Sequence, residues 1–565
     1  MALDRKTLLP LLILLGVVFL VYAPTTRGLF VYDEIEAVVQ NRMLFKTPLA
    51  QTLFTKNYFN ISLETSYRPV VTLTYLVDGM LWRGPFGWRL TNLLLHLLCV
   101  GLLYAFLRMW RMAMMPAWIG AAFFGLHPIH VETVASVGFR EDLLVGAGLL
   151  GMALSYAAWR NGRMKTAAAA LIAGLVVFLA QMSKENAFMA PVLLLAVAGC
   201  DEANTWVDAR RRWRTAFPLL IAVVAATALS LFIYFVLMYY PQPGDAREYS
   251  TLALWIRMPW IYLRHELLPL VIPYHLHPSR MVFLSRIGIV PIAMGWAVLL
   301  ALIFAGVQLV RRWRGDALGL LWFAIMWLPT SNIIPLHNLV ADRYAYVPDL
   351  GLGLLIGVAL QRGLERLRPV VLEDNAEEVD ERQNQQMLLI GAAAIVLVLC
   401  AVLTNRQLAR WRDIETLWTY QRSIEPDSVQ ALHSLAYNAQ QQSEMAAAQG
   451  NGNAAQFYGR QALEYSREAT RLAPNDLTSM GNYANALLRA GQLDEARPLF
   501  EQILRLTPRG RIILIQRSNH SLGLIELQSR KPDVKKALAY FKAAQAAGYY
   551  EDPTFMRNLE KEAGK

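Results

Sequence analysis

Long apolar runs alternate with short polar connections through the first 404 residues of the chain. Because a membrane-spanning helix needs about 20 mostly apolar residues, this pattern predicts about eleven spans. We therefore expect an all-α fold in which residues 1–404 form a polytopic membrane helix bundle. The predicted spans are 7–23, 88–107, 113–130, 142–159, 166–183, 186–200, 215–240, 287–310, 317–336, 345–361 and 387–404.

Basic residues gather in every second connection, and this predicts the orientation of the bundle. Basic clusters such as Arg210 to Arg212 alternate with short connections that hold a single basic residue, such as Lys184. By the positive-inside rule, the clusters and the N-terminus are cytoplasmic. Two large loops, 24–87 and 241–286, then lie outside.

This topology also predicts where two further segments lie relative to the membrane. Residues 250–273 are long enough to span but contain Arg264 and other charges, so we expect an amphipathic segment at the outer surface. The mixed-charge stretch 362–386 becomes a cytoplasmic linker. Everything after residue 404 lies outside.

Composition agrees with a membrane protein. The chain is 55% hydrophobic and only 17% charged, with a mean hydropathy of +0.31, whereas soluble domains carry about a quarter charged residues. The net charge of +11 is divided among short clusters between apolar runs. These values exclude an ordinary soluble enzyme, and they give no reason to expect nucleic-acid binding.

From residue 405 the composition becomes that of a soluble helical region. Pro474 precedes Pro508 by 34 residues, and Ala484, Ala496 and Phe500 occupy positions typical of a tetratricopeptide unit. The polar insert 440–456 predicts an enlarged turn in the preceding unit. We therefore expect an extracytoplasmic tetratricopeptide-repeat array over 405–565.

Ionisable residues gather at the predicted outer ends of the helices. Asp33 and Glu34 follow the first span, where a carboxylate could act as a general base toward a hydroxyl or be a solvated helix end. His127, His130 and Glu132 could ligate a metal, but their spacing is not a zinc signature, and structural hydrogen bonding is the alternative.

Cations accompany these acids along the same predicted face. Arginine suits phosphate binding, and glycosyl transfer from a polyprenyl-phosphate sugar needs both an anion-stabilising cation and a base. The cations are Arg68, Arg140, Lys184, Arg264 and Arg343, and the further acids are Asp142, Glu185 and Asp342.

The order of these elements resembles one family, the TMTC-like (transmembrane and tetratricopeptide-repeat) protein O-mannosyltransferases of the GT-C fold. The segments that carry the resemblance are VYDEIEAVVQN, SYRPVVTLTYLVDGMLW, FGWRLTNLLLHLLCVGLLY, FFGLHPIHVETVAS, FREDLL, SKEN and NLVADRYAYVPDLGLGLL. The resemblance implies an inverting membrane enzyme that moves a sugar from a lipid phosphate to Ser or Thr hydroxyls at the outer face.

The resemblance also implies roles for individual residues. Asp33 matches the candidate base and Glu34 the second acid of its pair, while Phe139 and Glu141 depart from the usual Gly and Ala. The implied phosphate contacts are Arg343, Arg140 and Lys184, to which we add Arg264 on the surface segment. The other motif positions are Arg68, His127, His130, Glu132, Asp142, Glu185 and Asp342.

Other interpretations of the function remain open from the sequence alone. The chain could be a non-catalytic tetratricopeptide scaffold, or a ligase or polymerase that uses a glycan acceptor. A bacterial inner membrane with periplasmic repeats and an undecaprenyl carrier is favoured, and a eukaryotic source would mean dolichyl phosphate and the endoplasmic reticulum. No cofactor is assigned, and a divalent metal is left open, as are the sugar, the acceptor protein and the oligomeric state.

Overall fold

The computed structural model divides into two compact units, and of the described residues those up to Asp413 form the first unit and those from Ile414 onward form the second. All regular elements in the described part of the chain are helices. The described residues are 5–31, 34, 41–55, 58–62, 66–201, 206–238, 256–261, 287–312, 314–331, 333, 341–367, 376–507, 512–547, 549 and 551–564.

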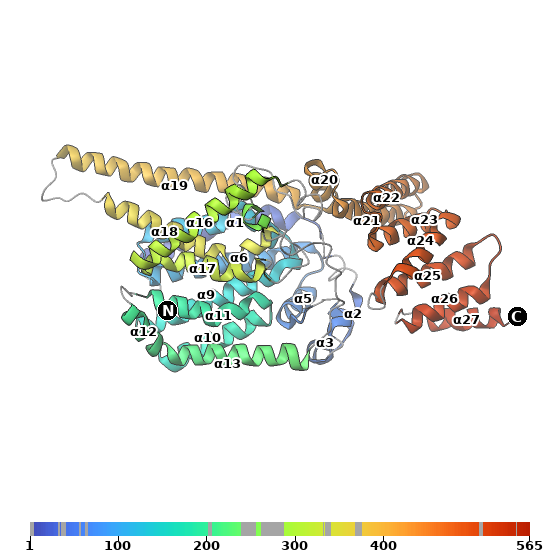
Figure 1. Ribbon diagram of the computed structural model, residues 1–565, viewed down its shortest axis with the longest axis horizontal. Coiled ribbons are helices and arrows are strands. Elements are labelled where there is room, and N and C mark those ends of the chain that lie inside the picture. The colour runs from blue at the N-terminus through green and yellow to red at the C-terminus, as the bar shows by residue number, and fades with distance from the viewer. Residues whose placement is uncertain are drawn as a thin grey trace. The chain divides into compact units, whose positions relative to one another are not determined.

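The first unit is built from long apolar helices and short helical turns that connect them. Figure 1 shows α9, α10 and α13 running side by side through it. Its helices are α1 (Arg5–Tyr22), α2 (Arg42–Lys46), α3 (Leu49–Phe54), α4 (Tyr58–Ser62), α5 (Pro69–Leu81), α6 (Pro85–Met109), α7 (Met114–Leu126), α8 (Val131–Ala135), α9 (Arg140–Arg160), α10 (Thr166–Gln181), α11 (Ala190–Cys200), α12 (Trp206–Thr215), α13 (Phe217–Phe232), α16 (Ile289–Arg312), α17 (Leu318–Trp327), α18 (Asp349–Arg366) and α19 (Ala376–Arg410).

Shorter helical turns join these helices, and several of them carry residues of the site described below. The 3-10 turns are η1 (Ala23–Arg27), η3 (Pro128–His130), η4 (Val137–Phe139), η5 (Glu185–Met189), η7 (Arg314–Ala317), η8 (Leu328–Thr330) and η9 (Asp342–Ala345), and η6 (Ile233–Leu237) is a π-helical turn.

Each of the eleven predicted spans overlaps a helix of this unit. Six helices in the described residues are long and apolar enough to cross a membrane, and further apolar helices are shorter. The first unit is therefore that of a multi-pass membrane protein, as predicted, while the number of spans stays a prediction. The six are Leu8–Arg27, Pro85–Met109, Val137–Arg160, Phe217–Leu237, Ile289–Gln308 and Asp380–Arg410.

Glycines allow three helices of this unit to approach closely. A Cβ on Gly120 of α7 would lie 2.4 Å from the carbonyl oxygen of Gly353 on α18, and one on Gly351 would lie 2.4 Å from that of Gly319 on α17. Small residues commonly mark such contacts between membrane helices, because the backbones then pack directly. Substitution of these glycines would force the helices apart.

The predicted inner connections meet at one end of the unit. Arg160 at the end of α9 donates to the carbonyl oxygen of Met109 at the end of α6 and pairs with Asp201, which follows α11. The predicted cytoplasmic linker 362–386 includes the end of α18, which continues to Arg366, and the start of α19 at Ala376; its place in the cytoplasm stays a prediction. Its Glu, Arg and Gln residues are good helix formers.

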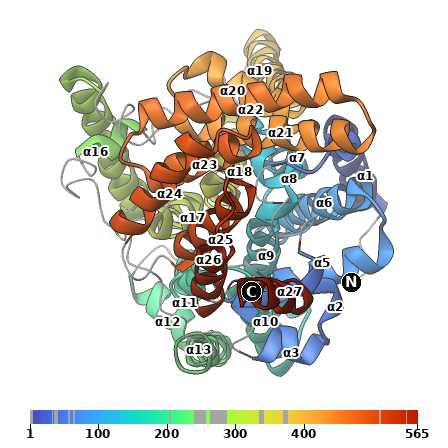
Figure 2. The same cartoon turned by 90° about the vertical axis from the view of Figure 1, so that its right-hand side faces the viewer.

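The second unit consists of consecutive helices that pack as neighbours along the chain (Figure 2). They are α20 (Ile414–Ile424), α21 (Val429–Ala448), α22 (Gly452–Leu472), α23 (Leu477–Arg489), α24 (Leu493–Leu506), α25 (Ile512–Gln528), α26 (Val534–Ala546) and α27 (Pro553–Ala563).

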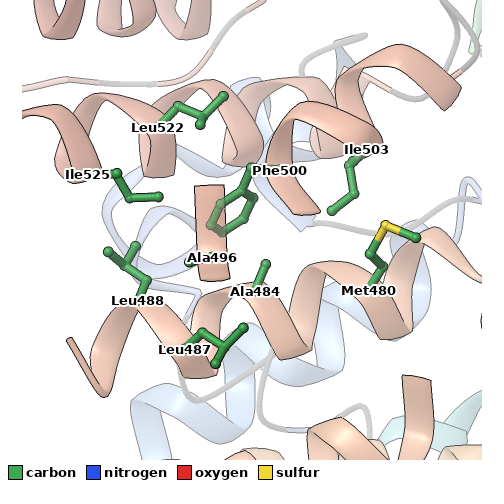
Figure 3. Close-up of a cluster of buried hydrophobic side chains, with 9 residues drawn as sticks. All are labelled: Met480, Ala484, Leu487, Leu488, Ala496, Phe500, Ile503, Leu522 and Ile525. Atoms are coloured by element: carbon green, nitrogen blue, oxygen red, sulfur yellow. The ribbon is translucent and has the colours of Figure 1, made fainter. Parts of the chain in front are cut away.

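The positions that suggested a repeat form the core of this unit. Ala484 of α23 and Ala496 and Phe500 of α24 are buried together with Leu522 of α25 (Figure 3). Gly491 adopts a φ of +74° in the turn between α23 and α24, a conformation that glycine adopts most readily. Small residues at the crossing let the paired helices approach, as a helical repeat requires; the tetratricopeptide assignment itself remains a prediction.

The enlarged turn predicted for 440–456 is wrong. The insert instead lengthens both helices of the hairpin, so α21 has 20 residues and α22 has 21. Only Gln449–Asn451 separates them, and the Asn451 side chain accepts from the backbone N–H of Ala454 to cap α22. Alanine, glutamine and methionine favour helix, which explains why this polar segment stays helical.

Candidate functional site

Arg140 is held in a fully buried ion pair. Its guanidinium donates to Asp78 at 2.5 Å, to Asn92 at 2.7 Å, to Thr74 at 3.1 Å and to the carbonyl oxygen of Trp88 at 3.0 Å. The side chain has no exposed surface. Because every nitrogen of the group already donates to protein, the structure argues against the predicted phosphate contact of Arg140, and we assign it to joining α5, α6 and α9.

Glu34 is likewise part of the protein interior. It is fully buried, and its carboxylate accepts from the backbone N–H groups of Val31 at 2.8 Å and Val137 at 2.6 Å. Arg89 lies 3.9 Å away and is also buried. Burial raises the pKa of Glu34, and Arg89 opposes that shift. The prediction of Glu34 as a catalytic or solvated acid is therefore not supported; it anchors the first loop.

A second set of ion pairs is only partly buried. We define Arg68, Glu141, Asp142, Lys184 and Glu185 as the charged cluster. Arg68 directly precedes α5, and the two acids Glu141 and Asp142 are in the first turn of α9. Lys184 directly precedes η5, which begins at Glu185. Acids are favourable in a first helical turn, where unpaired backbone N–H groups point at them.

The contacts within the charged cluster connect three separate segments. Arg68 donates to Glu141 and to Glu185, each at 3.2 Å, and Lys184 lies 2.6 Å from Asp142 and 3.7 Å from Glu141. The side chains of Arg68, Lys184 and Glu185 are 21%, 11% and 35% exposed. Here, unlike at Arg140, cations and a carboxylate remain accessible.

Arg343 lies beside this cluster on η9. Its guanidinium and backbone N–H both donate to Glu132, at 2.5 and 2.9 Å. The Tyr344 ring connects the two groups, because the Arg343 guanidinium lies 5.2 Å and the Lys184 ammonium 6.0 Å from its centroid. Asp342, which precedes Arg343, is buried.

The histidine turn is structural in its described contacts. His130 contacts the carbonyl oxygen of Phe124 at 2.8 Å and Asp349 at 3.1 Å, and the His127 ring accepts from the N–H of Ile129. Within the described residues, no group of three or more His, Cys, Asp and Glu is placed to hold a metal ion. The turn does not fit a metal site, since Glu132 and His130 are already engaged by protein groups.

The structure thus brings together some of the predicted residues and separates others. Arg68, Asp142, Lys184 and Glu185 meet in the charged cluster, and Glu132, Asp342 and Arg343 lie together beside it. The predicted base Asp33 and the predicted phosphate contact Arg264 lie outside the described residues.

Sequence reasoning missed several partners of these residues. Asp78 and Asn92 interrupt apolar runs, a signal that could have identified them as buried partners. Tyr234 on η6 donates to Glu185 at 2.6 Å, and Asp349 holds His130. Tyr234 lies within the predicted span 215–240 and Asp349 within the predicted span 345–361, and the apolar runs around them give no signal of these contacts.

The first unit, with apolar helices and accessible charges gathered at helix ends, is that of a multi-pass membrane protein with a polar site. Comparison with known proteins shows which membrane proteins this chain resembles. The protein O-mannosyl-transferase TMTC3 of Mus musculus is 23% identical over 91% of this chain and 61% of its own length, and that of Homo sapiens is 23% identical over 94% and 64%. The predicted resemblance is confirmed, although the chain spans only about three fifths of these relatives' length.

Other comparisons match a smaller share of this chain. The protein O-mannosyl-transferase F38B6.6 of Caenorhabditis elegans is 25% identical over 62% of this chain and 51% of its own length. No family model matches the chain. Two solved structures, each 14% identical, are an Archaeoglobus fulgidus oligosaccharyltransferase tethered with an acceptor peptide (TM-score 0.40, covering 73% of this chain and 57% of that one) and ArnT from Cupriavidus metallidurans bound to undecaprenyl phosphate (0.38, 74% and 80%).

Proposed function

We propose that this chain is a GT-C-type membrane glycosyltransferase that moves mannose or a similar hexose from a polyprenyl phosphate to Ser or Thr hydroxyls of proteins. The observation that carries the proposal is the charged cluster, where Lys184 and Arg68 remain accessible at the ends of apolar helices. The protein O-mannosyl-transferases that match most of the chain support it.

The chemistry of this transfer requires cations to stabilise the leaving phosphate and a base to accept the proton of the acceptor hydroxyl. The bond between the anomeric carbon and the phosphate oxygen breaks, and the acceptor oxygen forms a bond to the same carbon. Lys184 and Arg343 stabilise the leaving phosphate, since cations aimed at developing negative charge lower the barrier. The acceptor proton passes to the carboxylate of Asp33, our candidate base. Direct displacement inverts the configuration at the anomeric carbon.

The contacts of Arg343 define how it would meet the phosphate. Its side chain is 7% exposed, and its guanidinium pairs with Glu132 at 2.5 Å, so donor binding has to compete with or extend that pair. Lys184 is held by Asp142 and points its charge at the same aromatic ring, Tyr344. We therefore expect the two cations to bind one anionic group together.

The location of the reaction follows from the proposed topology. By that topology, the charged cluster would be at the outer ends of the spans, and the residues after 404 would also be outside. In a bacterial inner membrane the carrier is undecaprenyl phosphate and the second unit is periplasmic; in the endoplasmic reticulum the carrier is dolichyl phosphate. The helical array of the second unit would engage the acceptor protein, because stacked helix pairs form extended binding surfaces.

The test is sugar transfer in proteoliposomes with radiolabelled polyprenyl-phosphate mannose and a pool of envelope or secretory proteins. Wild type should label protein, and Asp33→Asn and Lys184→Gln should abolish most of the label. Arg362→Gln is the matched control, because it breaks an ion pair with Asp316 at the opposite, predicted inner end of the unit. Equal labelling by wild type and Lys184→Gln would contradict the role of the cluster.

If wild type does not label protein, two other results are informative. Transfer from a panel of other lipid-linked sugars would correct the donor. Transfer to a glycan instead of a protein would favour the ligase or polymerase, and no transfer from any donor to either acceptor would favour the non-catalytic scaffold.

A further inference from the structure

Tyr234 joins the charged cluster from a part of the chain that the proposed mechanism does not use. It lies on η6, the π-helical turn that follows α13. Its hydroxyl donates to Glu185 Oε1 at 2.6 Å, while Arg68 donates to Oε2 of the same carboxylate at 3.2 Å. The carboxylate is thus fixed from both sides.

The π turn explains how this contact arises. A π turn adds a residue to a helical turn and so rotates the side chains that follow, and such turns are frequent at functional sites. The Tyr234 ring packs against the cluster formed by Tyr58, Tyr67 and Met182, and meets the Phe188 ring edge to face at 6.3 Å. This packing fixes the hydroxyl in place.

An interfacial role is the plain alternative for this tyrosine. Tyrosines near the ends of membrane helices often lie at the headgroup level, with the hydroxyl directed to water. The Tyr234 hydroxyl is instead directed to a carboxylate that is 49 residues away in the chain. The contact therefore belongs to the site.

We propose that Glu185 binds hydroxyls of the transferred hexose and that Tyr234 is its positioning residue. An ionised carboxylate has about four acceptor positions and no donor, and Glu185 remains 35% exposed while Tyr234 and Arg68 hold it. Sugar hydroxyls are donors that match such a group. The half-buried rings of Phe188 and Tyr234 add an apolar wall that suits the C–H face of a sugar ring.

The inference rests on the proposed function and makes it more specific. Lys184 and Arg343 would recognise the phosphate, whereas Glu185 would recognise the sugar. A site built to bind a hydroxyl rejects the analogue that lacks it, because its polar groups are then left unpaired. Glu185 and Tyr234 therefore determine which sugar is accepted rather than whether phosphate binds.

The experiment compares polyprenyl-phosphate mannose with donors that each lack one ring hydroxyl. Wild type should use at least one deoxy donor about tenfold less well in kcat/KM. In Tyr234→Phe and Glu185→Gln, transfer from the mannose donor should fall while that deoxy donor is unaffected, so the discrimination disappears. If both variants slow all donors by the same factor, the sugar-binding role is overturned.

Tyr156→Phe is the matched control. The Tyr156 hydroxyl also donates to a buried carboxylate, Asp201, at 2.9 Å, and Arg160 again pairs with that acid, but this triplet lies at the opposite end of the helices. Its loss should leave the discrimination between donors unchanged. A loss of discrimination in Tyr156→Phe equal to that in Tyr234→Phe would show a general effect of stability and overturn the inference.

A binding measurement separates this inference from the proposed function. Wild type in detergent should bind polyprenyl-phosphate mannose more tightly than the deoxy donor, which carries the same phosphodiester charge, and Tyr234→Phe should bind the two equally. If this difference is seen without any transfer, the sugar subsite stands while the transferase proposal fails. If wild type binds both lipids equally, the subsite is overturned even where transfer is observed.

Discussion

Arg140 and Lys184 each face a carboxylate in the interior of the first unit, but the protein occupies their donors to different extents. Arg140 donates to four oxygens and is completely buried. Lys184 contacts two carboxylates and keeps 11% of its side chain exposed. A cation whose donors all serve the protein holds the fold, whereas one that keeps accessible surface is available to a ligand.

The same contrast applies to the acids. Glu34 accepts from two backbone N–H groups and is buried, while Glu185 is fixed by two side chains and remains 35% exposed. Both acids belong to motifs that suggest catalysis from sequence. Their surroundings separate an anchor from a candidate binding group.

The largest effect is expected from Arg140→Met. It leaves the Asp78 carboxylate buried without its charge partner, and breaking such a pair from one side costs about 3–5 kcal/mol. Thermal unfolding in detergent, followed by size-exclusion chromatography, should show a strong loss of folded protein. The double variant Asp78→Asn with Arg140→Met should recover part of it. A stable and inactive single variant would instead return Arg140 to the site.

Lys184→Gln should affect transfer far more than stability. Glutamine can still donate to Asp142, so the fold is retained, but the charge opposite the leaving phosphate is lost. Removal of one such stabilising group typically lowers turnover by about 10²–10³-fold. Transfer kinetics and thermal unfolding measured on the same preparation check this. If the loss of activity follows the loss of folded protein, Lys184 stabilises the fold, as Arg140 does, and does not act on the phosphate.

A smaller, pH-dependent effect is expected in the second unit. Arg497 contacts Glu526 at 2.5 Å and Lys536 contacts it at 2.9 Å, and these contacts lower the pKa of Glu526 below its ordinary value, the bond from Arg497 being the main cause. The stability from this lowered pKa is present above the ordinary glutamate pKa of 4.5 and is lost as the pH falls through the lowered folded value.

Glu526→Gln tests that sign. Unfolding of the full chain should show wild type more stable than the variant at pH 6, by about 1 kcal/mol or less, and the difference should shrink as the pH falls below 4.5. A difference that stays constant with pH would mean that packing rather than charge is responsible.

The smallest effect is expected from Arg362→Gln. Arg362 pairs with Asp316 at 2.8 Å but is 44% exposed, and such pairs contribute about 0–1 kcal/mol because water screens them. Transfer activity should equal that of wild type, and thermal unfolding should shift little. A loss of stability as large as that of Arg140→Met would contradict the expectation that buried ion pairs contribute more to stability than exposed ones.

Much of the fold could be predicted because it depends on local pattern. Apolar runs located helices at all eleven predicted spans, and the spacing of Ala484, Ala496 and Phe500 identified buried positions of the second unit. The enlarged turn predicted from the polar insert 440–456 is wrong, because the helix propensity of the insert outweighs its polar composition.

The sequence by itself determined which residue types stand at the helix ends: the acids, arginines and lysine of the site are all visible as charges beside apolar runs. Only the tertiary structure decided which of these charged groups are buried and fully hydrogen-bonded within the protein. Along the chain, Arg140 and Glu34 resemble Lys184 and Glu185. Their partners come from distant parts of the sequence: Asp78 pairs with Arg140, Arg89 lies near Glu34, and Tyr234 donates to Glu185. Burial and hydrogen bonding are properties of the packed helices, so spacing along one chain segment does not specify them.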